Sequence, residues 1–195
     1  MATVIESETE TETTPAVEPT YTAEEFMKMD LGDGLFELVR GRIVAMPPPR
    51  YRHGFVCLTV GILLGEYGRR TGLGHAASND SAIGISNVTV RGADVCYYSE
   101  ARWPQAEIGE GLPPVAPDLV VEVYSPSNRP AEMLEKVGDY LGAGALMVWV
   151  LHPEKQNLTI FRQDDPTPIV LAGKDVVGDL PELPGFRCQV AEFFC

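Results

Sequence analysis

Residues 118–151, DLVVEVYSPSNRPAEMLEKVGDYLGAGALMVWVL, decide the fold of this chain. The segment 118–124 is the strongest strand signal in the sequence, because aliphatic and β-branched residues dominate it. A helix is predicted from about residue 130 to residue 141, beginning with a proline at a position that the first helical turn tolerates. A second strand is predicted at 145–151. Strand, helix and strand in this order predict a right-handed crossover between two parallel strands.

The sequence on either side of this unit predicts further strands and helices. A capping box at 22–25 and apolar periodicity in the long segment 53–70 predict helices, and Gly72 is placed to end the second. Alternating patterns predict a hairpin at 36–46, short strands within 75–98, a proline-rich loop at 100–117, and a hairpin partner at 157–161. We therefore predict an α/β (α+β) fold in which a mixed β-sheet is flanked by helices.

Composition and charge favour one globular domain behind an acidic tail. The chain has 195 residues, 45% of them hydrophobic, and a formal net charge of -13. Residues 1–20 include the run ETETETT, hold five glutamates and no base, and lack apolar periodicity. We predict that 1–20 is a disordered acidic tail and that 21–195 is the folded domain. An acidic chain is not typical of proteins that bind nucleic acid non-specifically, because such binding depends on basic groups that neutralise phosphates. Two arrangements would remove this objection: bound cations that reverse the electrostatic field at one site, or a basic partner that contacts the DNA.

The cysteines and the N-terminus favour a cytoplasmic protein. The four cysteines are scattered without a CxxC pair, which is typical of reduced thiols. No stretch reaches the roughly 18 to 20 apolar residues that a membrane helix needs, and the N-terminus is the opposite of a signal peptide. We expect no membrane association.

Glu122 is the first chemical anomaly, because it stands inside the hydrophobic strand. Val121 and Val123 flank it, so Glu122 points to the opposite face, together with Asp118. A carboxylate there needs a partner, a metal ion or a proton. A neighbouring base or a solvated sheet edge would also explain it.

Asp94 is the best metal partner for Glu122. Asp118 shares the strand with Glu122, but four residues at about 3.3 Å each separate the two by about 13 Å. Asp118 is better explained as a turn or capping residue, whereas Asp94 begins another apolar strand. Two converging carboxylates favour Mg²⁺ or Mn²⁺ over zinc. A turn aspartate at a strand entry is the alternative for Asp94.

Lys136 lies in the helix that follows the Glu122 strand. One interpretation is a helix ion pair with Glu132, four residues earlier in the chain. The other is a cation that stabilises phosphate charge or orients water beside the metal.

The order of these segments closely resembles the Uma-type putative restriction endonuclease family of the PD-(D/E)XK nuclease superfamily. The resemblance covers about residues 21–194. It is carried by the segments FELVRGRIVAMPPP, RHGF, ADVCYYSEARW, PDLVVEVYSPSNR, EKVGDYLGAGALMVWVLHPE and LPGFRCQVAEFF.

The resemblance implies a restriction-endonuclease-like core and a set of site residues. Asp94 matches the first metal-binding aspartate, and Glu122 matches the acid of the E-x-K element. Tyr124 stands at the lysine position of that element, and Lys136 in the next helix takes its place. Glu37 matches a further acidic position, as a second metal or water ligand. His53 matches a family histidine, with a solvent-facing position at a helix start as the alternative.

The sequence also departs from the family pattern. Ala93 replaces the proline that usually precedes the first aspartate, and Arg40 and Arg42 stand where relatives tend to be acidic. The two arginines would either contact phosphate or neutralise Glu37.

The implied reaction is Mg²⁺- or Mn²⁺-dependent hydrolysis of DNA phosphodiesters, with DNA as the partner and a homodimer left open. The alternatives are an inactive nuclease-fold module that binds nucleic acid or protein, and a hydrolase of another phosphate-containing substrate. In a structure, Lys136 in the same cleft as Asp94 and Glu122 would favour the enzyme, and Lys136 paired with Glu132 in solvent would favour the module.

Overall fold

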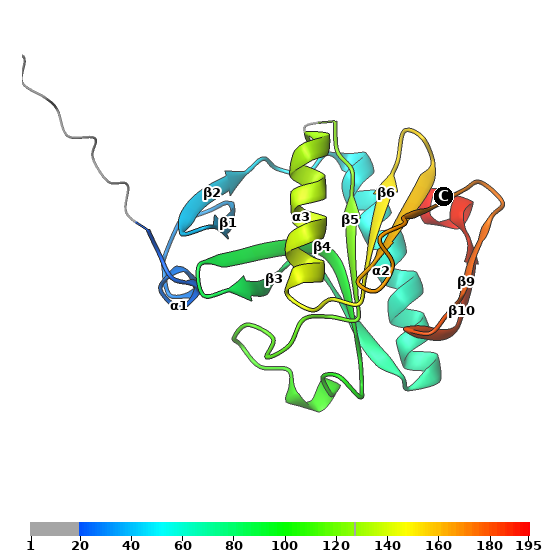
Figure 1. Cartoon of the computed structure of the whole chain (residues 1–195), viewed down its shortest axis with the longest axis horizontal. Helices are drawn as coiled ribbons and strands as arrows, with labels where there is room; N and C mark the ends of the chain where they lie inside the picture. Colours follow the sequence, from blue (N-terminus) through cyan, green and yellow to red (C-terminus); the bar gives the residue numbers. More distant parts are fainter. Residues whose placement is uncertain (1–19, 127) are drawn as a thin grey trace, which may run out of the picture.

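The computed structural model describes residues 20–126 and 128–195 (Figure 1). The predicted acidic tail lies, apart from Thr20, outside the described residues. Two α-helices of two turns or more and a central sheet account for most of the described chain, and the predicted mixed α/β fold class is confirmed.

The helices begin and end close to the predicted residues. The three α-helices and two 3₁₀-helices are α1 (Ala23–Met27), α2 (Tyr51–Thr71), η1 (Gln105–Glu107), α3 (Pro130–Gly142) and η2 (Val190–Phe194). The capping box predicted at 22–25 is present at the start of α1, and Gly72 ends α2 in the left-handed conformation, at φ 69°.

The strands form one large sheet and one small one. Their bounds are β1 (Leu35–Val39), β2 (Arg42–Met46), β3 (Gly74–Ser86), β4 (Thr89–Ser99), β5 (Leu119–Val123), β6 (Met147–His152), β7 (Asn157–Arg162), β8 (Ile169–Ala172), β9 (Val176–Leu180) and β10 (Leu183–Gln189). The large sheet has the order β2-β1-β4-β5-β6-β7-β8, with β3 also paired to β4, and β9 pairs with β10. The predicted parallel pair is confirmed, because β5 pairs with β6 in parallel around α3.

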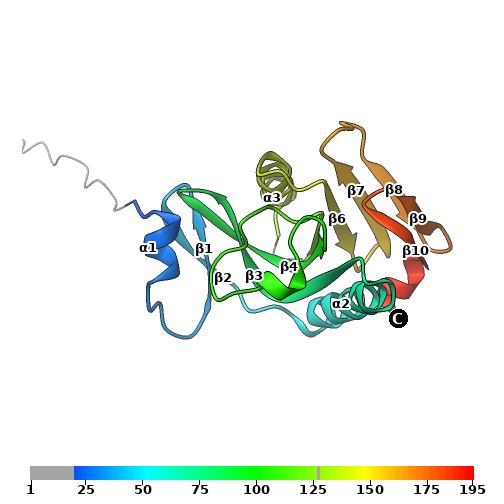
Figure 2. The ribbon, with the colours of Figure 1, turned by 90° about the horizontal axis from the view of Figure 1, so that it is seen from below.

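The two long helices cover opposite faces of the large sheet (Figure 2). On the α2 face, the alternate β5 residues Leu119, Val121 and Val123 join a core that also takes side chains from β9, β10 and η2. On the α3 face, Val120 packs with Tyr140 in a second core. Burial on both faces explains why β5 is almost continuously hydrophobic.

The register of β4 and β5 brings the two predicted carboxylates together. Val95 pairs with Val121 in the antiparallel ladder. The same register, continued by one residue, sets Asp94 opposite Glu122. Side chains that are opposite in an antiparallel pair share a face and have Cβ atoms about 5 Å apart.

One expectation from the sequence was wrong, and three strands were missed. The segment 75–98 forms two long strands rather than several short ones, because a bulge keeps the polar residues Asn79 and Asp80 within β3. Both residues have positive φ, 72° and 52°. The strands β8, β9 and β10 were not predicted. Phe193 and Phe194 close the core, since both are buried in it.

Among the described residues, no helix combines the length and the apolar character needed to cross a membrane.

The close approach of α2 to β3 yields a test of packing. A Cβ at Gly68 would collide with the carbonyl of Gly74, whereas a Cβ at Gly65, on the same helix, would meet no atom within 4 Å. We expect Gly68→Ala to lower the free energy of unfolding by about 1–3 kcal/mol. Gly65→Ala, the matched control, should raise it by about 0.5–1 kcal/mol, because alanine reduces the backbone freedom of the unfolded chain. Urea unfolding measures both, and equal stabilities would contradict this packing.

Candidate metal and active site

Asp94 and Glu122 line one small cavity at the end of β5. Its volume is about 60 Å³, and Asp80, His53 and Lys136 also line it. Both Asp94 and Glu122 are buried. A cavity of this size has room for an ion and a few waters but not for an organic cofactor.

The carboxylate of Asp94 is held by two other elements. Its Oδ2 accepts a hydrogen bond from the backbone N–H of Val123, at 2.6 Å. His53, near the start of α2, brings its Nε2 to 3.2 Å from the same oxygen, and the His53 side chain is only 14% exposed. His53 is therefore directed at Asp94, and the alternative of a solvent-facing histidine is excluded.

The carboxylate of Glu122 meets two side chains of α3. The Lys136 Nζ lies 3.1 Å from Oε1 and 3.0 Å from Oε2, and the Tyr140 hydroxyl donates to Oε1 at 2.8 Å. Lys136 and Tyr140 are four residues apart, so both lie on the face of α3 that packs on the sheet. Lys136 does not pair with Glu132, which lies 3.8 Å from Arg129 instead.

Glu37 is a second acceptor for Lys136 and also connects it to Arg91. Its Oε1 lies 3.0 Å from Lys136 Nζ and accepts from the Gly92 N–H, and its Oε2 accepts from Arg91 at 2.9 Å. Arg91 also donates to Asp139 at 2.6 Å. Glu37, unlike Glu122, does not line the small cavity, which favours a positioning role over direct metal ligation.

Arg40, one of the two unusual arginines of the first hairpin, contacts an acid of α3. Arg40 pairs with Glu135 of α3 at 3.0 Å, so its charge is directed to that helix. Glu37 itself is paired with Arg91 and Lys136, at 2.9 Å and 3.0 Å.

Asp80, Arg91, Tyr140 and Cys57 are site residues that the sequence did not point to. Asp80 lies in the β3 bulge, which the sequence did not reveal, and Arg91 belongs to no sequence motif that indicates a function. Tyr140 is part of the EK...Y pattern quoted above, which was the one available signal. Cys57 Sγ lies 3.4 Å from His53 Nδ1, one helical turn away.

The pKa shifts indicate a concentration of negative charge in this cavity. Burial raises the pKa of Glu122, and the charge of Asp94 adds to that, against the opposing effect of Lys136. Burial and Asp94 likewise raise the pKa of Asp80. Burial lowers the pKa of His53, but its hydrogen bond to Asp94 and the nearby acids outweigh this, so the net shift is upward.

The residues fit a divalent cation of the kind that the sequence predicted. Three carboxylates, from Asp80, Asp94 and Glu122, converge on a cavity where Lys136 is the one lysine. Converging carboxylates repel one another unless a cation lies between them, and oxygen donors suit Mg²⁺ and Mn²⁺. Asp94 and Glu122 would hold the ion. Asp118 does not line this cavity. Its Oδ2 instead accepts a hydrogen bond from the backbone N–H of Ser99, at 2.7 Å.

Removing the buried ammonium tests the network. We expect Lys136→Met to lower the free energy of unfolding by about 3–5 kcal/mol, because Glu122 and Glu37 lose a buried partner. Lys136 now opposes the upward pKa shift of Glu122, so its removal raises that pKa further. A carboxyl group whose pKa is raised in the folded protein destabilises the fold as pH rises, because it ionises more easily in the unfolded chain. The loss of unfolding free energy in Lys136→Met should therefore be larger at pH 8 than at pH 5.

Urea unfolding of metal-free protein at the two pH values measures this deficit. The control is Lys28→Met, whose side chain is 73% exposed, and it should change stability by less than about 0.5 kcal/mol. A deficit that shrinks as pH rises would contradict the assignment.

Comparisons with known proteins agree with this fold. A solved structure, described as a putative nuclease belonging to DUF820 from Anabaena variabilis ATCC 29413, superposes with a TM-score of 0.77. The match has 19% sequence identity and covers 89% of this chain and 97% of that chain, which shows a shared fold. No curated protein matches the sequence. A family model, Uma2, described as a putative restriction endonuclease, matches residues 23–191. The chain therefore belongs to the Uma2 family.

Proposed function

We propose that this protein is a metal-dependent endonuclease that hydrolyses DNA phosphodiesters. The observation that carries the proposal is the convergence of Asp94, Glu122 and Lys136 on one small cavity. The family and the fold support a nuclease. The metal, the residues and the DNA substrate are the new elements of the proposal.

Asp94 and Glu122 hold one or two Mg²⁺ or Mn²⁺ ions in this proposal. Bound there, the cation would activate a water and neutralise charge on the phosphate. The Val123 N–H and His53 keep the Asp94 carboxylate oriented toward the cavity, through contacts of 2.6 Å and 3.2 Å. This orientation is set before any ion arrives, which reduces the reorganisation needed at binding.

Lys136 supplies the positive charge beside the reacting phosphate. Its ammonium lines the cavity and is 12% exposed, so its field is weakly screened by water. A fixed cation of this kind stabilises negative charge that develops in the transition state. Glu37 and Tyr140 act as positioning residues: Glu37 holds the ammonium and Tyr140 holds Glu122.

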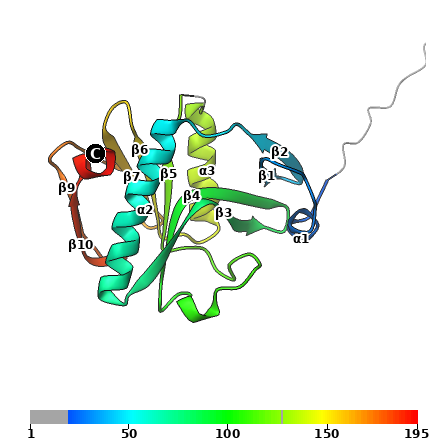
Figure 3. The same cartoon turned by 180° about the vertical axis from the view of Figure 1, so that it is seen from behind.

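Two helix starts give the acidic chain a local preference for phosphate. α2 begins after Arg50 and α3 begins after Arg129, and both helices start at the same end of the sheet (Figures 1 and 3). Pro49 and Asn128, the residues just before these two arginines, line the cavity. Helix N-termini favour anions, and exposed arginines add charge-assisted contacts to phosphate.

The alternative is an inactive module of the same fold that binds nucleic acid or a protein. The net charge of -13 favours it. The burial of Lys136 against Glu122 and Glu37, rather than its exposure beside Glu132, favours the enzyme.

Cleavage of DNA tests the proposed activity. Supercoiled, linear duplex and single-stranded DNA are incubated with the protein and Mg²⁺, Mn²⁺ or a chelator. Asp94→Asn and Glu122→Gln keep the size and part of the hydrogen bonding but lose the charge, so each should reduce the rate at least about 100-fold. The matched control is Asp118→Asn, directly before β5 and also buried, which should cleave at the wild-type rate. Cleavage that survives both site substitutions, or proceeds in the chelator, would refute the proposed site.

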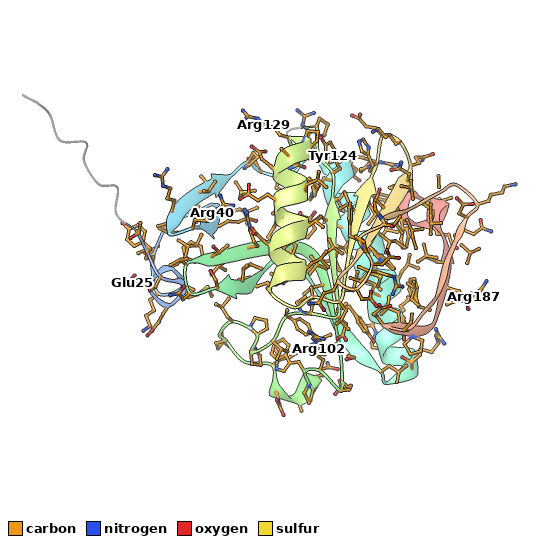
Figure 4. The ribbon with its side chains drawn as sticks, viewed as in Figure 1. Glu25, Arg40, Arg102, Tyr124, Arg129 and Arg187 are labelled. Carbon is orange, nitrogen blue, oxygen red and sulfur yellow. The ribbon has the colours of Figure 1, made fainter. Side chains whose placement is uncertain are left out.

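A second prediction concerns the arginines at the helix starts. Arg50→Gln and Arg129→Gln should each weaken DNA binding and reduce the slope of log K against log salt by about 1, because each removes one phosphate contact. The control is Arg187→Gln, an exposed arginine on β10 that is remote from Arg129 (Figure 4). Fluorescence anisotropy in Ca²⁺ at several salt concentrations measures the slope. Equal slopes for all three variants would exclude these contacts.

A further inference from the structure

Three ligand atoms of different chemistry meet beside the proposed nuclease site. His53, Cys57 and Asp94 each offer one such atom, and the three atoms lie within 4.8 Å of one another. His53 and Cys57 are four residues apart on α2, so their side chains lie on one face of the helix. His53 contacts both of the others, with Nδ1 3.4 Å from the sulfur and Nε2 3.2 Å from the carboxylate.

The proposed nuclease reaction does not use the thiol of Cys57. Cys57 does not line the 60 Å³ cavity but a neighbouring one of about 170 Å³, which His53, Asp80 and Asp94 also line. Asp94 and His53 therefore line both cavities, whereas the Cys57 sulfur belongs only to the second. The second has carboxylates from Asp80 and Asp94 and no lysine or arginine in its lining, so its electrostatic field favours a cation.

The ligand set of the second cavity selects a different metal from the first. A thiolate and an imidazole suit Zn²⁺ and similar thiophilic ions, whereas Mg²⁺ prefers oxygen and retains its waters. Zinc bonds to these ligand types are about 2.0–2.3 Å long, so ligand atoms around one ion are at most about 4.6 Å apart. The observed cluster needs only a small closing movement to reach that geometry.

We propose that His53, Cys57 and Asp94 form a binding site for Zn²⁺ or another thiophilic divalent cation, and that this ion inhibits the nuclease by withdrawing Asp94 from the Mg²⁺ position. The inhibition rests on the proposed function, but the binding does not. On binding, the Cys57 S–H bond breaks, a sulfur–metal bond forms, and the proton leaves to solvent. No oxidation or reduction occurs.

Cobalt binding tests the site without reference to activity. Co²⁺ added to the wild-type protein should give a near-ultraviolet charge-transfer band that arises from thiolate ligation. Cys57→Ser should lose the band and bind Co²⁺ at least about tenfold more weakly, since even loss of an outer-shell partner of a metal ligand costs that much. Cys188→Ser and Cys195→Ser, which alter thiols outside the cluster, should keep the band. A band that survives Cys57→Ser, or no band in the wild type, would overturn the proposal.

Thiol alkylation provides a readout that needs no variant to fold. Zn²⁺ should slow the carbamidomethylation of Cys57 by iodoacetamide at least about tenfold, as measured by mass spectrometry of peptides, and should leave Cys195 unaffected. Equal rates with and without Zn²⁺ would refute ligation by the thiol.

Zinc inhibition of cleavage then separates this proposal from the nuclease function. The rate of each variant is expressed relative to its own rate in Mg²⁺ alone. Half-inhibition should need at least about tenfold more Zn²⁺ in Cys57→Ser than in the wild type. A cobalt band with no cleavage in any metal would refute the nuclease and leave the ion site standing. Magnesium-dependent cleavage with no thiolate band would refute the ion site alone.

Discussion

The buried ammonium of Lys136 is the interaction on which the site depends. It joins α3 to β5 through Glu122 and to β1 through Glu37, and Glu37 continues to Arg91 of β4. Positive and negative groups alternate along this chain of contacts, so each buried charge has an opposite neighbour. A buried carboxylate without such a neighbour would be protonated or would destabilise the fold. The sheet can therefore keep two acidic side chains, Glu37 and Glu122, beside its hydrophobic core, each in contact with a cationic partner.

Several of these features could be predicted because they disturb a local pattern. Glu122 interrupts an apolar strand, and the distance along that strand excluded Asp118 in favour of Asp94. The parallel β5–β6 pair followed from strand, helix and strand in sequence. The role of Lys136 could not be predicted in this way, because its spacing was also explained by an ion pair with Glu132 within the helix. Its contacts with Glu122 and Glu37 depend on how α3 packs on the sheet, and residue spacing carries no information about that packing.

The remaining site residues were not predictable because their roles come from long-range geometry. Asp80 reaches the cavity only through a bulge that gives it a φ of 52°, and a run of polar residues did not distinguish a bulge from the end of a strand. Arg91 is separated by 54 residues from Glu37, its partner in the network. The strands β8 to β10 are short, and β8 is largely exposed, so their hydrophobic alternation is weak. Local pattern thus predicted Asp94 and Glu122 but neither Asp80 nor the groups that hold these acids.

The acidic character of the chain and a phosphate substrate are compatible once net charge and local field are separated. At physiological salt the Debye length is about 8 Å, so a phosphate responds mainly to nearby charges, and more distant carboxylates are screened. Around the cavity, the nearest groups are the Lys136 ammonium, two helix starts with their arginines, and carboxylates that a divalent ion would neutralise. Without the ion, the three carboxylates would repel phosphate. In the proposed reaction the ion would therefore serve substrate binding as well as chemistry, so an ion that moves Asp94 away would affect both steps at once.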